Sequence, residues 1–252
     1  YQSLAAHSPI QSPTCLYAAI EPETQEFLLV LEDQGSEAAG DQLQACSGSE
    51  LTAAFTSAGQ LHAKFWNQTE QFEWLVSQRN LESIAFKRDV IYLPSIERTL
   101  ALFPRHFNDK LAELVMRVGE QYLDLFQRAM CGPQTVIHGD YRIDNMFLYD
   151  AAGQTNIVAV DWQNTSSGCG VHDLAYFSSQ SVGNDLRGEI EIAALREYYD
   201  VLTAGGVTEY SFEECLECYR LNLLVTFITP LAVCGTLDSG NERGMKLGEA
   251  ML

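Results

Sequence analysis

The sequence has 252 residues, 34 acidic and 15 basic side chains, and a formal net charge of −19 at pH 7. A surface of this charge repels phosphate backbones and anionic lipid headgroups, so we expect neither a nucleic-acid partner nor a membrane-surface role. The length allows one large domain or two small ones, with a core that needs no disulfides or metals. The acidic composition leaves open whether it provides solubility alone or favours a cationic substrate.

The seven cysteines are odd in number and irregularly spaced, which indicates free thiols in a reducing cytosol and therefore a cytoplasmic protein. One CxxC pair, Cys215 and Cys218, lies in a predicted helix without a second pair or a histidine pair nearby, which favours packing over a zinc site. The most apolar stretch, Leu221 to Cys234, is too short to span a bilayer core, so we interpret it as a buried helix.

In chain order, two short apolar runs come first, over residues 16–20 and 26–31, and the polar turn between them predicts a β-hairpin. From Leu51 to Phe65 apolar residues recur every three or four positions, as on one face of an amphipathic helix. His62 lies on that apolar face, where we expect a buried, hydrogen-bonded histidine.

The middle of the chain shows weaker periodicity over residues 67–108. A second helical stripe then runs from Leu111 to Ala129, with Asn108 as its N-cap. Short β-rich runs follow, and the last two are joined by a hairpin loop; these runs cover residues 135–137, 146–149 and 156–160. Helices are predicted for the remainder, at about 188–203, from Ser211 with a capping box to Glu214, and over 242–252.

Three oxygen-bearing side chains stand at the ends of these β-rich runs. Asp140 and Asn145 lie in the loop between the first two runs, and Asp161 ends the third. A hairpin brings its two ends together, so we expect Asn145 and Asp161 to be neighbours. One carboxylate and one amide oxygen suit magnesium, which completes its shell with water and substrate phosphates. Asp140 would lie beside this pair, where phosphoryl transfer needs a base, and His138 would pack beneath the loop.

The stretch His138-Gly-Asp140-Tyr-Arg-Ile-Asp-Asn145, followed by Asp161-Trp-Gln163, resembles the aminoglycoside phosphotransferase and choline-kinase-like families. The ecdysteroid-kinase-like branch is the most similar, through Leu29–Asp33, Gly40–Gln42, Leu61–Trp66 and His172–Phe177. The resemblance covers nearly the whole chain. It implies an α+β, protein-kinase-like two-lobe fold, in which residues 1–33 are a remnant of the N-terminal β lobe and residues 34–252 form the helical C-terminal lobe.

The resemblance further implies a kinase that transfers the γ-phosphoryl group of ATP to a hydroxyl group of a small molecule. Asp140 would be the catalytic base, and Asn145 and Asp161 would be the ligands of Mg²⁺. His138 and Asp173 would support the catalytic loop, Asp173 as the buried acid that hydrogen-bonds it. The alternative for Asp173 is a helix N-cap, and both roles are compatible.

The hinge between the lobes would be formed by Leu31, Glu32 and Asp33, whose backbone would face the adenine. These families also need a nucleotide-binding hairpin, a phosphate-gripping lysine and its glutamate partner before the hinge, but the first Lys or Arg here is Lys64. We therefore expect the sequence to be part of a longer chain, and the alternative is a pseudokinase that serves as a binding or scaffold module. The substrate stays open between a cationic compound and a neutral, bulky alcohol, and so does the oligomeric state.

Overall fold

A computed structural model describes residues 4–5, 7–24, 26–44, 46–151, 153–238 and 240–252. The strands in this part of the chain are β1 (Cys15–Ile20), β2 (Phe27–Leu31), β3 (Val76–Ser77), β4 (Thr135–Ile137), β5 (Met146–Ala151), β6 (Gln154–Ala159) and β7 (Ser166–Gly168). The α-helices are α1 (Gly48–Lys64), α2 (Leu81–Lys87), α3 (Leu93–Leu102), α4 (Asp109–Glu120), α5 (Tyr122–Ala129), α6 (Val171–Ser181), α7 (Asn184–Ala204), α8 (Phe212–Thr226), α9 (Ile228–Thr236) and α10 (Glu242–Met251).

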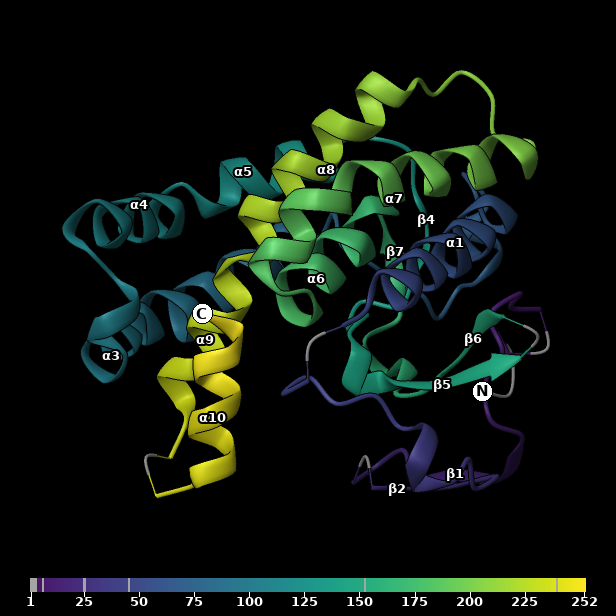
Figure 1. The fold of residues 1–252 in the computed structure, drawn as a ribbon, viewed down its shortest axis with the longest axis horizontal. Coiled ribbons are helices and arrows are strands. Elements are labelled where there is room, and N and C mark those ends of the chain that lie inside the picture. Colours follow the sequence, from purple (N-terminus) through teal and green to yellow (C-terminus); the bar gives the residue numbers. More distant parts are fainter. Residues whose placement is uncertain (1–3, 6, 25, 45, 152, 239) are drawn as a thin grey trace.

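The strands form small sheets rather than one large one. β1 pairs with β2 and β5 with β6 as antiparallel hairpins, and β7 lies between β3 and β4. In Figure 1 the β1–β2 hairpin lies at the lower edge of the molecule, below the β5–β6 hairpin, whereas β4 and β7 lie among the helices. Helices and small sheets in this proportion confirm the α+β class. The predicted boundary after residue 33 stays a prediction, and residues 1–3, 6 and 25 of that segment lie outside the described residues.

The helix starts follow the predicted caps in most places. Asn108 caps α4, and the capping box of Ser211 and Glu214 begins α8. The single helix predicted over residues 111–129 is wrong, because the chain leaves helical geometry at Gln121 and forms α4 and α5. Just before this break, a Cβ on Gly119 would lie 2.7 Å from Cδ1 of Ile96 in α3, so that the isoleucine side chain would have to shift, and a glycine weakens a helix interior.

The apolar helix near the C-terminus is longer than predicted. Within the described residues, one helical stretch, Phe212–Thr236, is long and apolar enough to cross a membrane by length and composition, so the expectation that it is too short is wrong. However, 56% of its most apolar window is buried inside the protein. Its α8 part packs on α5 and α6, and its α9 part packs on α3, which is the environment of a core helix.

The core lies behind the loop that joins β4 to β5. Leu51, Phe55 and Leu61 of α1 are fully buried, and α1 packs against α7, β4 and β6. From within this loop, the hydroxyl of Tyr141 donates a hydrogen bond of 2.8 Å to the carbonyl oxygen of Ala54 in α1. The loop is therefore attached to a buried, apolar part of the protein.

Candidate active site

The loop His138–Asn145 begins with a sharp turn at Gly139. Gly139 has a φ of +82°, in the left-handed region that glycine adopts without strain. A Cβ at this position would also collide with the backbone carbonyl of Asn164. Only glycine therefore lets the two segments pack this closely.

Asp173 holds the start of this loop through its backbone. Its carboxylate accepts hydrogen bonds from the N–H groups of His138, at 2.7 Å, and Gly139, at 3.0 Å. The N-cap alternative is wrong, because α6 starts at Val171 with Gly170 as its N-cap, and Asp173 lies inside the first turn. The carboxylate is thus directed at the backbone of the loop.

Asp173 is completely buried, and the imidazole of His62 lies against its carboxylate. Nε2 of His62 lies 3.3 Å from its Oδ2, and Nδ1 of His62 meets the hydroxyl of Tyr198 at 3.1 Å. Burial alone would raise the pKa of Asp173, but the hydrogen bond and charge of His62, together with His138 and the loop N–H groups, outweigh it and lower that pKa. The predicted buried, hydrogen-bonded His62 therefore braces the acid that shapes the loop.

His138 lies beneath the loop with both ring nitrogens engaged. Its Nδ1 accepts a hydrogen bond from the N–H of Asp140, at 3.3 Å, and its Nε2 donates to the carbonyl of Val160, at 2.9 Å. The ring also contacts the indole of Trp162, with 4.6 Å between the centroids. Burial lowers its pKa. A neutral imidazole with this tautomer links the loop to the end of β6.

The carboxylate of Asp140 collects donors from three directions. Its Oδ1 accepts from Nε of Arg142, at 3.1 Å, and its Oδ2 accepts from Nδ2 of Asn145, at 3.0 Å. The hydroxyl of Tyr176 on α6 also donates to it, and burial followed by the charge of Asp140 raises the pKa of Tyr176. The Asp140 side chain is only 13% exposed. Since a carboxylate offers about four acceptor sites, it can still receive a further donor.

Asn145 and Asp161 come together at the open end of the β5–β6 hairpin. Met146 pairs with Ala159, and the N–H of Val160 donates to the carbonyl of Asn145, at 2.9 Å. Asp161 follows directly in the left-handed conformation, with a φ of 62° and a ψ of 56°. Such a conformation in a residue other than glycine is uncommon and clusters at functional sites.

The donor atoms at this end suit a hard cation. Among the described residues, no group of three or more histidine, cysteine, aspartate and glutamate side chains is arranged to hold a metal ion. The predicted pair is of a different kind, one amide and one carboxylate. Both hydrogen bonds from the Asn145 side-chain amide go through its nitrogen to Asp140, which leaves its oxygen for a cation. Magnesium bound by two protein oxygens, water and phosphate fits this set.

The three predicted hinge residues lie apart from the loop. Leu31 ends β2, and the carboxylate of Glu32 accepts a hydrogen bond from the hydroxyl of Thr14, at 2.7 Å. Glu32 lines a cavity of about 400 Å³ together with Val158 of β6, whereas Leu31 and Asp33 are not among its lining residues. Asp33 accepts from the N–H of Gly35 at 2.9 Å. Of the three, Glu32 therefore faces a cavity that β6 also lines.

A second cavity, of about 380 Å³, opens beside the loop His138–Asn145. Gly139 and Tyr176 line it on the loop side, and Tyr92 and Phe126 give it an aromatic wall. Its volume lies in the range typical of small-molecule sites. The sequence analysis missed Tyr176 as a site residue, although it lies three residues after Asp173 on one helix, and this spacing puts two side chains on one face.

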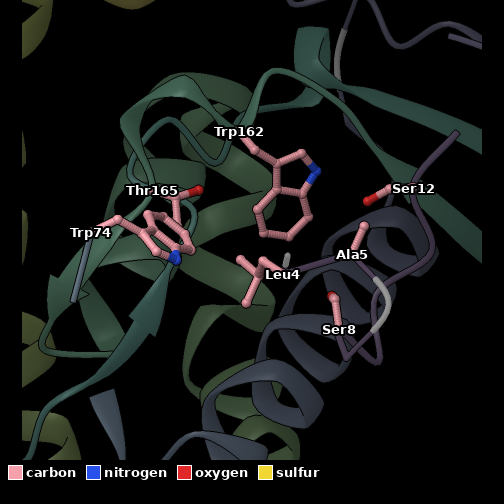
Figure 2. A pocket seen from close by; sticks show the side chains of 7 residues that line it. All are labelled: Leu4, Ala5, Ser8, Ser12, Trp74, Trp162 and Thr165. Atoms are coloured by element: carbon pink, nitrogen blue, oxygen red, sulfur yellow. The ribbon is translucent and has the colours of Figure 1, made fainter. Parts of the chain in front are cut away.

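A smaller cavity of about 140 Å³ adjoins it at Thr165, which lines both. Figure 2 shows the indole of Trp74 on one side and Ser12 and Ser8 on the other, with Trp162 and Leu4 between them. The indole N–H of Trp162 donates to the carbonyl of Ala159 at 3.1 Å, so its polar group is already satisfied. Trp162 therefore presents apolar ring surface to this cavity.

Comparisons with known proteins bear on the fold. The profile of the ecdysteroid kinase-like family matches residues 3–206. No curated protein matches the sequence. Similar solved structures include an aminoglycoside phosphotransferase from Streptomyces rimosus in complex with ADP and streptomycin, with 12% identity and a TM-score of 0.52 over 91% of this chain and 79% of that one.

Two further structures agree with this. An ethanolamine kinase from Plasmodium vivax has 10% identity and a TM-score of 0.51 over 98% of this chain and 67% of that one. The GDP complex of aminoglycoside 2′-phosphotransferase-IIIa has 15% identity and a TM-score of 0.53 over 98% of this chain and 77% of that one. At these identities the likeness shows the fold alone, and it confirms the predicted protein-kinase-like architecture.

Proposed function

Since this chain belongs to the ecdysteroid kinase-like family, we propose that it transfers the γ-phosphoryl group of ATP to a hydroxyl group of a small molecule, with Asp140 as the catalytic base. The chain is a kinase-type phosphotransferase, the enzyme class predicted from the sequence. The observation that carries the proposal is the convergence of Asp140, Asn145 and Asp161 at one end of the β5–β6 hairpin, on a loop whose backbone Asp173 holds.

In the proposed reaction the acceptor hydroxyl donates its hydrogen bond to the Asp140 carboxylate. The new bond joins the acceptor oxygen to the γ-phosphorus, the bond from that phosphorus to the β-phosphate oxygen breaks, and the proton passes to Asp140. Asn145 and Arg142 fix the carboxylate, so its position is set before the acceptor arrives. Asn145 and Asp161 would hold Mg²⁺, which supplies charge neutralisation on the phosphate oxygens.

We propose that the adenine binds in the cavity between Glu32 and Val158, next to the hinge, and that the acceptor binds in the cavity beside Gly139. The acceptor cavity has one charged lining residue, Lys87, and no lining carboxylate. The aromatic wall alone would suit a cation, but the charge of Lys87 repels one, and no carboxylate among the lining residues offsets that charge. The cavity therefore favours an uncharged alcohol, and the charge of −19 is then a property of the outer surface.

We place this activity in the cytosol, which supplies ATP and keeps thiols reduced. All seven cysteines are free, and Cys46, Cys169, Cys215 and Cys234 are buried in the core. Buried free thiols are typical of a reducing compartment.

The decisive experiment measures transfer of the γ-phosphoryl group of ATP in the presence of Mg²⁺ to a panel of acceptors: an ecdysteroid, streptomycin and ethanolamine. We expect turnover of the ecdysteroid, and Asp140→Asn or Asp161→Asn should lower kcat by roughly 10³-fold or more. Asp150→Asn is the matched control, because Asp150 is an exposed aspartate at the far end of the same hairpin. Turnover that survives Asp140→Asn would refute the assignment.

The second candidate function is a binding module without catalysis. The observation in its favour is that no Lys or Arg precedes Lys64, so this sequence contains no cation before the hinge to grip the phosphates. A thermal-shift titration separates the two functions, since a ligand that binds the folded state raises Tm. Enzymatic function requires a shift with ATP and Mg²⁺ together, and a module of the second kind would show none.

A further inference from the structure

The CxxC pair of α8, Cys215 and Cys218, has a third cysteine next to it. Cys169 lies in the short connection between β7 and α6, and α8 packs on α6 (Figure 1). A Cβ on Gly132, which follows α5, would lie 3.6 Å from Sγ of Cys218 and 4.0 Å from Sγ of Cys169. Two sulfurs from distant parts of the sequence therefore border the same glycine.

The thiols of Cys169 and Cys218 contact each other, and one hydrogen-bond network holds the backbone of both residues. The Cys169 thiol donates a hydrogen bond to the sulfur of Cys218. The carbonyl of Cys169 accepts from the N–H of His172, at 2.9 Å, and the carbonyl of Cys218 accepts from Nδ2 of Asn222, also at 2.9 Å. Nδ1 of His172 in turn donates to Oδ1 of Asn222, at 3.1 Å. The fold therefore fixes the contact between the two thiols.

The two thiols differ in exposure and in acidity. Cys169 is only 2% exposed, and its hydrogen bond to Cys218 together with burial raises the pKa of its thiol. Cys218 is half-buried. The hydrogen bond from Cys169 and a further one from Tyr210 lower the pKa of Cys218 to about 7, against burial and the charges of two nearby glutamates. Near neutral pH Cys218 is therefore largely available as thiolate, the nucleophilic form, beside a protonated thiol.

The other cysteines nearby lack this combination of properties. Cys215, in the same helix as Cys218, is fully buried, and burial raises its pKa to about 12, so it stays a thiol. Cys131 is exposed beside Gly132 and is the competing partner that a test has to separate. An accessible cysteine of low pKa next to a second thiol is the arrangement that responds to peroxide, because the second thiol traps the oxidised first one.

We propose that Cys218 and Cys169 are a modification site at which hydrogen peroxide converts two thiols to a disulfide. The Cys218 thiolate attacks one peroxide oxygen, the O–O bond breaks, and a sulfenic acid and one water form. The Cys169 sulfur then attacks the sulfenic sulfur, the S–S bond forms, and the hydroxyl leaves as a second water with the Cys169 proton. The two sulfurs are oxidised, the peroxide is reduced, and a dithiol reverses the change. Neither nucleotide nor acceptor takes part, so this inference does not rest on the proposed function.

The test treats the full chain at pH 7, without nucleotide, with a small molar excess of hydrogen peroxide. Free thiols are counted in denaturant and alkylated, and mass spectrometry then maps the linked peptides after digestion with trypsin and a glutamate-specific protease. This digestion places Cys131, Cys169, Cys215 and Cys218 on separate peptides. We expect the count to fall by two from the seven thiols of the reduced chain, with Cys169 joined to Cys218, and dithiothreitol should restore it.

Three variants assign the roles of the two thiols. In Cys169→Ser, peroxide should leave Cys218 as a sulfenic acid that dimedone traps, whereas the wild type should give little of this adduct because Cys169 removes the sulfenic acid. Cys218→Ser should form no disulfide within the chain. Cys131→Ser is the matched control: it removes the exposed neighbouring thiol and should still lose two thiols to the same link.

The other outcomes overturn the inference. They are a link through Cys131 or Cys215, a wild type that keeps all its thiols, and a dimedone adduct on Cys218 that is as abundant in the wild type as in Cys169→Ser. The wild-type peptide map decides even if a serine variant does not fold. The proposed function fails separately, by transfer that does not depend on Asp140.

Discussion

Glycines with a positive φ lie near both ends of the β5–β6 hairpin, but for different reasons. At the closed end, Gly153 has a φ of +80° and a Cβ there would meet nothing within 4 Å. Beside the open end, Gly139 has a φ of +82°, but a Cβ would collide with the carbonyl of Asn164. Burial rises along the hairpin from its exposed tip to Met146 and Ala159. A positive φ alone therefore does not separate a turn from a site, whereas its surroundings do.

The largest effect is expected for Asp173, whose carboxylate accepts hydrogen bonds from the loop beside the open end. Asp173→Ala removes the acceptor of two loop N–H groups and the partner of His62. We expect the free energy of unfolding to fall by about 3–5 kcal/mol, because the groups left behind are buried and unpaired. Urea denaturation at pH 7 measures this. Asp150→Ala at the exposed tip should change it by less than about 0.5 kcal/mol, and equal losses would erase the distinction between the two ends.

The two glycines provide the most direct comparison. Gly153→Ala should lower the free energy of unfolding by about 1 kcal/mol, because an alanine is strained in the left-handed conformation. In Gly139→Ala the new Cβ also collides with the backbone carbonyl of Asn164. We therefore expect the free energy of unfolding to fall by about 2–4 kcal/mol in total. Chemical denaturation of both variants gives the difference. Similar values for both would mean that the loop yields easily and that close packing does not fix it.

The open end could be predicted from the sequence because its signals are local. The spacing of Asp140 and Asn145 and the return of the chain to Asp161 need only a hairpin, and β5 and β6 form it as expected. Roles that depend on where a helix begins were predicted less accurately from the sequence. Asp173 suggests an N-cap by type, but the N-cap is Gly170, and this shift of three residues changes which way the carboxylate points.

The part of the acceptor cavity that Val76 and Ser166 line could not be predicted because it is a non-local arrangement. Val76 and Ser166 are far apart in sequence, and their pairing joins a two-residue strand to a three-residue one. Runs this short carry no alternation that a sequence pattern can detect.

The buried end should also make stability depend on pH. Burial lowers the pKa of His138 and of His172, whose Nδ1 hydrogen-bonds the side chain of Asn222. The unfolded chain then binds more protons than the folded one below about pH 6.5, so stability is present above that pH and is lost as the pH falls. Each histidine contributes up to about 1.4 kcal/mol per pH unit. Denaturation at pH 7 and pH 5.5 measures the loss, which His172→Gln should halve; a flat profile would contradict the burial of these rings.

The smallest effect is expected where the open end meets the acceptor cavity. Tyr176→Phe removes one donor to the Asp140 carboxylate but keeps the ring that lines the cavity. Arg142 and Asn145 still hold the carboxylate, so we expect kcat to fall only about tenfold, equivalent to about 1.4 kcal/mol. The KM for ATP and the free energy of unfolding should not change. Tyr92→Phe is the matched control, because its hydroxyl bonds Tyr122 in the same cavity and not Asp140. If both variants lowered kcat equally, the effect would lie in the cavity wall and not in the orientation of Asp140.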